Sequence, residues 1–288
     1  MVKIISDYGY CFGVEHAIQI LLDGQNRKGK VYLTHPLLHN KLENEKMMKS
    51  VSASFLTKDV CLKKEDQVIL SAHGHTIEEE RFLENKCVLK DATCPLILKR
   101  YQQIPPFEDG VSYLYLGKER HQETLGFLSH FPYFKFIDSA LDGKEQLDGI
   151  PLLEKSVVIP QTTVSPNKLA ALLSEVSKRS EVIFSLPICP FYGRRGKEAS
   201  QFIKDLCPKK NAFLVCGDTS SSNAREIFSQ MRNANKELFG QICLSIYDLN
   251  LSDFQNKNIY IASATSVSKE TVLKLKADLI DKFGDVEY

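Results

Sequence analysis

The feature that most constrains the fold of this chain is a recurring pattern, in which a short apolar run ends in small or polar residues and a segment with helical periodicity follows. The clearest apolar runs are residues 68–70, 113–116, 212–215 and 259–261. Chains that alternate strands and helices in this way form mostly parallel sheets covered by helices. With 288 residues, 43% of them hydrophobic, the chain can bury a large core. The sequence therefore predicts an α/β fold.

Three segments show the apolar periodicity of core-facing helices. The first begins directly after the segment 11–13, and its apolar positions are Val14, Ala17, Ile18, Leu21 and Leu22. The second follows Ser165 and Pro166, and the third follows Ser268. Serine is a preferred N-cap and proline is favoured in the first helical turn. We therefore expect helices to begin at both serines.

The charge balance excludes several partners. Lys and Arg total 37 and Asp and Glu total 36, so the net charge is +1 and nucleic acid is not expected as a partner. No apolar run approaches the roughly 18 residues of a membrane-spanning helix, and the first residues lack the apolar region of a signal peptide. We expect a cytoplasmic protein without membrane association.

Its eight cysteines are then expected to be reduced, and most of them to be small buried apolar residues.

Three of the cysteines, Cys11, Cys94 and Cys189, have similar surroundings, because each lies in a turn-like segment beside glycine or proline at about equal spacing. This pattern indicates three comparable units that each contribute one thiolate to a shared centre. Both an iron-sulfur cluster and zinc favour soft sulfur ligands. The alternative is that three of eight cysteines lie near turns by chance, since the chain has no Cys-x-x-Cys pair.

Polar residues gather where the predicted strands end, which is where open α/β sheets bind ligands. A histidine is found in each of three such loops: His39, His73 and His121. Each one alone is typical of a surface residue, but together they indicate a polar pocket. Further loops carry short neutral donors suited to phosphate oxygens, although serine-rich turns are more often simple N-caps. These donors are Ser221, Ser222, Asn223 and Ser266.

Glu123 follows His121 by two residues, and a carboxyl group in such a pocket can donate a proton. The ordinary alternative is a solvated glutamate. Thr162, in the segment 161–163 before the helix predicted after Ser165, offers a further short donor.

Taken together, these motifs resemble those of the 4-hydroxy-3-methylbut-2-enyl diphosphate reductases, the IspH/LytB family, in the family's order and over nearly the whole chain. The segments that carry the resemblance are 11–14, 39–40, 71–74, 91–95, 121–123, 161–163, Cys189, Arg195 and 221–223. The resemblance implies three similar α/β units in a trefoil-like arrangement around a central metal cluster. The implied units are residues 12–94, 95–186 and 187–288, the last completed by 1–11.

The resemblance also implies the chemistry. Cys11, Cys94 and Cys189 would hold a 4Fe-4S cluster, and Glu123 with Thr162 would relay protons. The diphosphate would be bound by His39, His73, His121, Ser221, Ser222, Asn223 and Ser266. The reaction would be the two-electron reductive dehydroxylation of 4-hydroxy-3-methylbut-2-enyl diphosphate to isopentenyl and dimethylallyl diphosphate, in isoprenoid biosynthesis by the methylerythritol phosphate pathway. A ferredoxin or flavodoxin would supply the electrons.

Two other functions fit the same residues. The segment after Cys189 departs from the family pattern, with Pro190, Phe191 and Tyr192 next to the cysteine. A non-catalytic or redox-sensing metal-binding paralogue is therefore the main alternative. A structural zinc protein with three cysteines and one histidine is a third interpretation.

Overall fold

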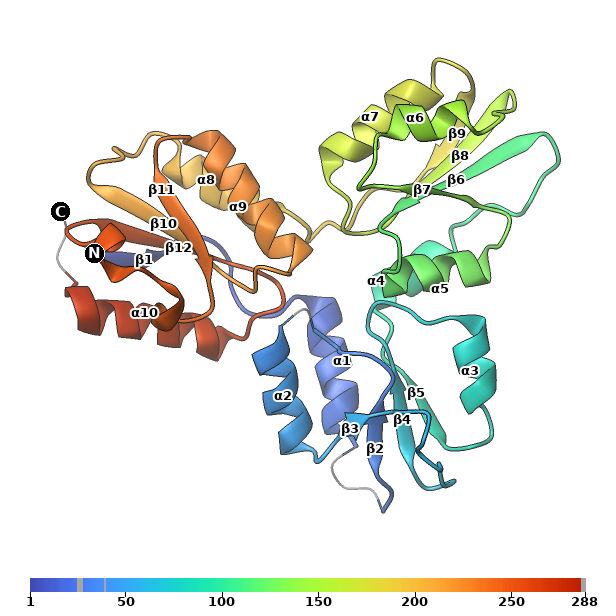
Figure 1. The fold of residues 1–288 in the computed structure, drawn as a ribbon, viewed down its shortest axis with the longest axis horizontal. Helices are drawn as coiled ribbons and strands as arrows, with labels where there is room; N and C mark the ends of the chain where they lie inside the picture. Colours follow the sequence, from blue (N-terminus) through green and yellow to red (C-terminus); the bar gives the residue numbers. More distant parts are fainter. Residues whose placement is uncertain (25–27, 39, 286–288) are drawn as a thin grey trace. The chain divides into compact units, whose positions relative to one another are not determined.

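The computed structural model describes residues 1–24, 28–38 and 40–285. Within them lie three sheets of four strands, in which every pair of neighbouring strands is parallel (Figure 1). The strand order of the first sheet is β3(Ser54–Phe55), β2(Val31–Leu33), β4(Gln67–Leu70), β5(Val88–Asp91). The order of the second is β7(Lys135–Asp138), β6(Val111–Gly117), β8(Lys155–Pro160), β9(Glu181–Ser185). The order of the third is β11(Phe239–Cys243), β10(Asn211–Cys216), β12(Asn258–Ser263), β1(Val2–Ile4).

The three sheets share one strand order. In each, the strand that comes first in its unit lies between the second and the third, and the fourth lies beyond the third. In the third sheet β1 takes the fourth place, although it comes from the other end of the chain. The predicted class, α/β with three similar units built on parallel sheets, is confirmed. All four predicted apolar runs lie in strands, namely β4, β6, β10 and β12.

The helices are α1(Phe12–Leu22), α2(Lys41–Ser50), α3(Ile77–Leu83), α4(Pro95–Tyr101), α5(Gln122–His130), α6(Gly143–Asp148), α7(Pro166–Val176), α8(Arg194–Ile203), α9(Ser222–Ala234) and α10(Lys269–Phe283). The helices predicted after Cys11, Ser165 and Ser268 are confirmed as α1, α7 and α10. Ser268 accepts a hydrogen bond from the Thr271 N–H, whereas Ser165 occupies the N-cap position without a side-chain bond. Two short 3₁₀ helices, Ile246–Asp248 and Leu251–Phe254, complete the list.

Contacts divide the chain into two compact units. Unit 1 consists of Met1–Glu15, Leu38–Met47 and Pro190–Tyr288, and unit 2 of His16–Leu37 and Met48–Cys189. The third sheet belongs to unit 1, with α8 and α9 on one face and α10 on the other (Figure 1). The second sheet belongs to unit 2, where Phe127 of α5 packs on one face and Leu147 of α6 and Leu172 of α7 on the other. The boundaries after residues 94 and 186 stay a prediction.

Two of the expectations about composition can be compared with the structure. No helix in the described part of the chain is long and apolar enough to cross a membrane. None of the eight cysteines, all of which are described, forms a disulfide. The expectation that most of them are buried is wrong, because only Cys216 and Cys243 are buried. Cys61 and Cys207 are exposed in loops between regular elements, and the other four are partly exposed.

Candidate active site

The three predicted ligand cysteines have equivalent places in the fold. Each follows the fourth strand of its sheet and precedes a helix, and each is partly exposed and not in a disulfide. Each also donates its backbone N–H to a carbonyl in the loop after the third strand. The bonds are Cys94 to Ala72 (2.9 Å), Cys189 to Thr162 (3.0 Å) and Cys11 to Thr265 (3.3 Å). The repeated bond sets each cysteine at the carboxyl edge of a parallel sheet, the edge where such sheets bind ligands.

These cysteines are divided between the units, with Cys11 in unit 1 and Cys94 and Cys189 in unit 2. Among the described residues, no group of three or more His, Cys, Asp or Glu side chains is arranged to hold a metal ion. The cluster and its ligands therefore stay a prediction.

Glu123 is a buried carboxyl group held by Thr162. Its side chain is only 4% exposed, at the start of α5. Thr162 follows β8 and donates its backbone N–H to one carboxyl oxygen (2.7 Å) and its hydroxyl to the other (2.6 Å). The solvated glutamate that was the ordinary alternative is therefore excluded, and the predicted pair is in direct contact.

Burial raises the pKa of Glu123 above its usual range, because a carboxylate loses its hydration in the interior. The two bonds from Thr162 and the positive charge of Arg100 act in the opposite direction without cancelling the effect. A carboxyl group of raised pKa holds its proton closer to neutral pH, which is the property that a general acid needs.

Two of the predicted histidines lie beside this pair. His121 is the N-cap of α5 and accepts the Glu123 N–H through Nδ1 (3.2 Å). The rings of His73 and His121 meet edge to face with centroids 5.7 Å apart. Gly74 next to His73 has a φ of +100°, and a Cβ there would lie 4.0 Å from the Glu123 Cα. In unit 2 the structure thus brings His73, His121, Glu123 and Thr162 together at the sheet edges.

The neutral donors lie in unit 1. Ser221 is the N-cap of α9 and accepts the Ala224 N–H (3.3 Å), so the capping alternative holds for it, and Ser222 is the first residue of that helix. Asn223 accepts the Thr265 N–H through Oδ1 (2.9 Å). Ser266 is 6% exposed, and its hydroxyl has no hydrogen-bond partner among the described residues. A buried hydroxyl without a partner is unusual in native proteins and suits a site that a polar ligand completes.

His39 lies outside the described residues, but its neighbour Asn40 is described and buried. The side chain of Asn40 accepts the Glu43 N–H (3.2 Å), and its buried Nδ2 has no partner in the part of the chain that the structure describes. Asn40 is therefore a second orphaned donor in unit 1. In the sequence, the sign of a role for Asn40 is its position next to His39, but the sequence analysis assigns only His39 to the site.

Glu43 of α2 is a buried carboxylate that sequence analysis missed. It accepts hydrogen bonds from the hydroxyls of Tyr10 (2.8 Å), Ser268 (2.8 Å) and Thr271 (2.5 Å). Burial acts to raise its pKa, but the bonds from Thr271, Tyr10 and Ser268 outweigh burial and hold the pKa below its usual range. Since Tyr10 precedes Cys11, the charged Glu43 ties the Cys11 loop to the start of α10.

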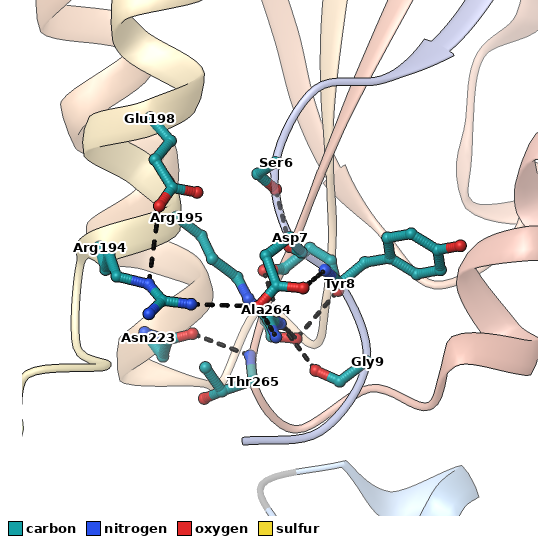
Figure 2. Close-up of polar contacts among 11 residues, drawn as sticks. Ser6, Asp7, Tyr8, Gly9, Arg194, Arg195, Glu198, Asn223, Ala264 and Thr265 are labelled. Carbon is teal, nitrogen blue, oxygen red and sulfur yellow. Dashed lines mark hydrogen bonds and ion pairs between the residues drawn. The ribbon is translucent and has the colours of Figure 1, made fainter. Parts of the chain in front are cut away.

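Arg195 of α8 is a buried cation in the same unit (Figure 2). It donates to the carbonyls of Gly9 (2.7 Å) and Ala264 (3.1 Å), and its other amino group lies 3.5 Å from the Asp7 carboxylate. The neighbouring Arg194 is more exposed and pairs with Asp7 and Glu198 instead. Burial lowers the pKa of Arg195, and the charge of Asp7 opposes that effect.

Comparison with known proteins identifies the family. The model of the LytB protein family matches residues 2–280. The chain belongs to the LytB family. Its relatives within that family include the 4-hydroxy-3-methylbut-2-enyl diphosphate reductase of Campylobacter fetus, 28% identical over 277 residues that cover 95% of this chain and 94% of the relative. The reductase of Helicobacter pylori is 26% identical over 276 residues, with 95% and 96% covered.

A third LytB relative, the reductase of Fusobacterium nucleatum, is 29% identical over 280 residues; the match covers 93% of this chain but only 32% of that protein. Among solved structures, the E-1-hydroxy-2-methyl-but-2-enyl-4-diphosphate reductase of Plasmodium falciparum superposes with a TM-score of 0.78 at 21% identity, covering 98% of this chain and 87% of that one. A second solved structure, of (E)-4-hydroxy-3-methyl-but-2-enyl diphosphate reductase, superposes with a TM-score of 0.71 at 21% identity. The match covers 97% of this chain and 99% of that one. These similarities show that the fold is shared with the solved reductases.

Proposed function

We propose that this chain is a 4-hydroxy-3-methylbut-2-enyl diphosphate reductase of isoprenoid biosynthesis. The reaction consumes two electrons and two protons, breaks the allylic carbon-oxygen bond and releases water, and it leaves isopentenyl or dimethylallyl diphosphate. Membership of the LytB family over residues 2–280 and the names of full-length relatives support this activity.

The observation that carries the proposal is the buried Glu123–Thr162 pair. Hydroxide is a poor leaving group, so the departing oxygen needs a proton. Glu123 is buried, has a raised pKa and is oriented through both carboxyl oxygens by Thr162. A carboxyl group in this state can deliver a proton to a substrate oxygen bound beside it.

The donor set fits an iron-sulfur cluster. Cys11, Cys94 and Cys189 are partly exposed and equivalent in the fold, and three soft thiolates suit a 4Fe-4S cluster that leaves one iron for the substrate. Such a cluster, when bound, supplies the electrons and a Lewis-acidic iron. The chain's own part is to hold the three thiolates, exclude water and deliver the proton.

The diphosphate is the anionic end of the substrate, and the polar groups of unit 1 fit it. In Asn223 the acceptor end of the amide is bonded to the backbone, so the donor end is the part that can face an anion. The orphaned Ser266 hydroxyl and the N-terminus of the 13-residue helix α9 add further donors. We propose Ser222, Asn223, Ser266, Asn40 and the predicted His39 as diphosphate ligands, with His73 and His121 of unit 2.

We further propose a ferredoxin or flavodoxin as electron donor, since the reaction consumes two electrons, and the cytoplasm as the location, since the cluster requires reduced thiols. The alternative of a non-catalytic paralogue is less well supported. The relatives are named as reductases, and this chain keeps the carboxyl group that turnover needs and holds it in the buried state.

The test is anaerobic purification followed by iron and sulfide analysis and a turnover assay with the allylic diphosphate and a chemical reductant. We expect about four irons and four sulfides per chain and formation of both products. Cys11→Ser, Cys94→Ser and Cys189→Ser should lose the cluster, because a hydroxyl is a poor ligand for iron. Cys207→Ser, at an exposed cysteine, is the control and should keep it. A loaded protein without turnover would indicate the paralogue, and zinc without sulfide would indicate the structural zinc protein.

A further inference from the structure

Two arginines occupy matching positions relative to the predicted ligand cysteines. Arg100 stands six residues after Cys94, and Arg195 stands six residues after Cys189. Arg100 lies in α4, the helix that begins directly after Cys94, and Arg195 lies in α8, the first helix after Cys189. The same spacing from Cys11 leads to Ala17, which is fully buried. Two of the three cysteines are therefore followed by an arginine at one fixed distance along the chain.

Both arginines make the same contacts with the strand ends of a sheet. Arg100 donates to the carbonyls of Pro160 and Pro187 in unit 2. Pro160 ends β8, the third strand of its sheet, and Pro187 lies two residues before Cys189. The guanidinium group of Arg100 thus joins the end of β8 to the Cys189 loop, which follows β9, the fourth strand of the same sheet.

Arg195 repeats this arrangement in unit 1. It donates to the carbonyls of Ser263 (3.4 Å) and Ala264 (3.1 Å) at the end of β12, again the third strand of its sheet. It also donates to the carbonyl of Gly9 (2.7 Å), which lies two residues before Cys11 (Figure 2). The two arginines therefore bond to equivalent residues, because each donates to the carbonyl of the residue two positions before a cysteine.

Guanidinium chemistry explains why arginine is used. Its planar group carries five N–H donors and stays charged, so it can satisfy carbonyls from two separate segments at once. A lysine ammonium is a compact point charge on a flexible stem and fixes such a bridge less well. Because Arg195 is 4% exposed, its charge is stable there only while these carbonyls and Asp7 are bonded to it.

The Cys94 loop is held in a different way. Thr93, directly before Cys94, donates its hydroxyl to the carbonyl of Ser71 beyond β4 (3.4 Å) and contacts Nδ1 of His75 (3.2 Å). Its backbone N–H is bonded to the Asp91 carboxylate (2.8 Å). A residue of the Cys94 loop itself, Thr93, therefore bonds this loop to the end of the third strand, and no arginine takes part in that bond. The Cys94 loop can serve as a reference when the Cys11 and Cys189 loops are measured.

We propose that Arg100 and Arg195 are positioning residues, each of which fixes the loop of the next ligand cysteine in chain order: Arg100 fixes Cys189 and Arg195 fixes Cys11. The positioning itself is a property of the apoprotein. Its purpose rests on the proposed function, in which these cysteines hold the cluster.

Hydrogen exchange of the apoprotein, resolved by peptide and mass spectrometry, tests the assignment. In Arg100→Met the Cys189 amide, bonded to Thr162, should exchange about tenfold faster, since one lost bond to a charged group is worth that much. The Cys11 and Cys94 amides should keep their rates. In Arg195→Met the Cys11 amide, bonded to Thr265, should exchange faster while those of Cys94 and Cys189 do not change. Lys99→Met and Lys197→Met, at exposed positions of α4 and α8, are the matched controls and should match the wild type at all three cysteines.

The conservative variants Arg100→Lys and Arg195→Lys guard against loss of folding and should give smaller increases at the same single loop. After anaerobic reconstitution, each methionine variant should also show a changed electron paramagnetic resonance spectrum, restored in part by lysine. Equal acceleration at all three loops, or none at the assigned loop, would overturn the proposal. A wild type that takes up no iron while the exchange pattern holds would refute the proposed function and leave the positioning assignment supported.

Discussion

Glu43 and Glu123 are two buried carboxyl groups in the same chain whose pKa values are shifted in opposite directions. Their exposed fractions are 6% and 4%, and each accepts a hydrogen bond from a threonine hydroxyl. Glu123 has one bonding residue, Thr162, whereas Glu43 has Tyr10, Ser268 and Thr271. Desolvation is the largest influence on both, and it prevails at Glu123 only. Glu123 lies deeper in the protein than Glu43 and has fewer donors, and both differences favour its protonated form.

This difference separates two tasks. A carboxyl group that several hydroxyls hold as an anion is a good anchor and a poor acid. A buried one with fewer donors keeps a proton that it can transfer. Glu43 therefore fits a structural role beside the Cys11 loop, and Glu123 fits the proton donor. The two sites can be compared by making the same substitution in each.

The largest expected effect is on turnover. Glu123→Gln keeps the size of the side chain but carries no transferable proton, so the rate should fall by about 10²–10⁴-fold, the usual contribution of a general acid. Glu43→Gln should retain turnover within about tenfold of the wild type, because it removes no transferable proton. Single-turnover assays on protein of matched iron content measure both. Similar losses in the two variants would remove the distinction between acid and anchor.

The second effect is on stability, and here we expect the larger loss from Glu43→Gln and the smaller loss from Glu123→Gln. In Glu43→Gln three hydroxyls lose a charged acceptor, and bonds to charged groups are stronger than neutral ones, so the free energy of unfolding should fall by about 2 kcal/mol. Glu123→Gln replaces a group that is protonated over more of the pH range and should cost less than about 1 kcal/mol. Urea unfolding of the apoprotein gives both numbers. A greater loss at position 123 than at position 43 would contradict the assignment of the anchor.

The third effect is a pH dependence of opposite sign. The folded pKa of Glu123 is raised, so the folded state binds more protons than the unfolded state, and its contribution to stability declines as pH rises from about 4.5 through the folded value. The folded pKa of Glu43 is lowered, so its contribution is present above about 4.5 and is lost as pH falls below it. One proton gives a slope of at most about 1.4 kcal/mol per pH unit. Comparison of each Gln variant with the wild type between about pH 2 and 7 isolates the two slopes.

The smallest effects come from the threonines. Thr162→Val removes the hydroxyl bond to Glu123 but keeps the backbone N–H bond, so turnover should fall by about tenfold and the pKa of Glu123 should rise further. Thr271→Val should cost about 1 kcal/mol of stability and leave turnover unchanged, since Tyr10 and Ser268 still hold Glu43. The alkaline limb of the pH–rate profile, where Glu123 loses its proton, and urea unfolding are the two measurements. A larger loss of turnover in Thr271→Val than in Thr162→Val would reverse the comparison.

The parts of the fold that the sequence predicts are those with local signals. Alternation of apolar runs and helical segments predicts the parallel α/β class, and Ser268 predicts the start of α10 from its own position and that of the apolar residues after it. The contact between Glu123 and Thr162 agrees with the role that the resemblance implies for that pair. Each of these inferences needs only residues that are close along the chain, or motifs that occur in the order known from the family.

Glu43 and Arg100 have no such signal. Glu43 lies in a helix of mostly charged residues, and its partners Tyr10 and Ser268 are 33 and 225 positions away along the chain. Arg100 bonds only to backbone carbonyls, at positions 160 and 187, and carbonyls are present at every residue. Burial of a charge is decided by what the tertiary fold brings to it, so sequence pattern alone does not reveal it.

The pairing of β1 with β12 separates the time at which the Cys11 loop is made from the time at which it acquires its structure. Val2 pairs with Ile259, and the Cys11 amide and the Gly9 carbonyl are bonded to Thr265 and Arg195. Ribosomes add about 5–20 residues per second, so this loop waits on the order of ten seconds or more for its partners during synthesis. Any metal delivered to Cys11 in its folded position must therefore arrive after translation has passed β12.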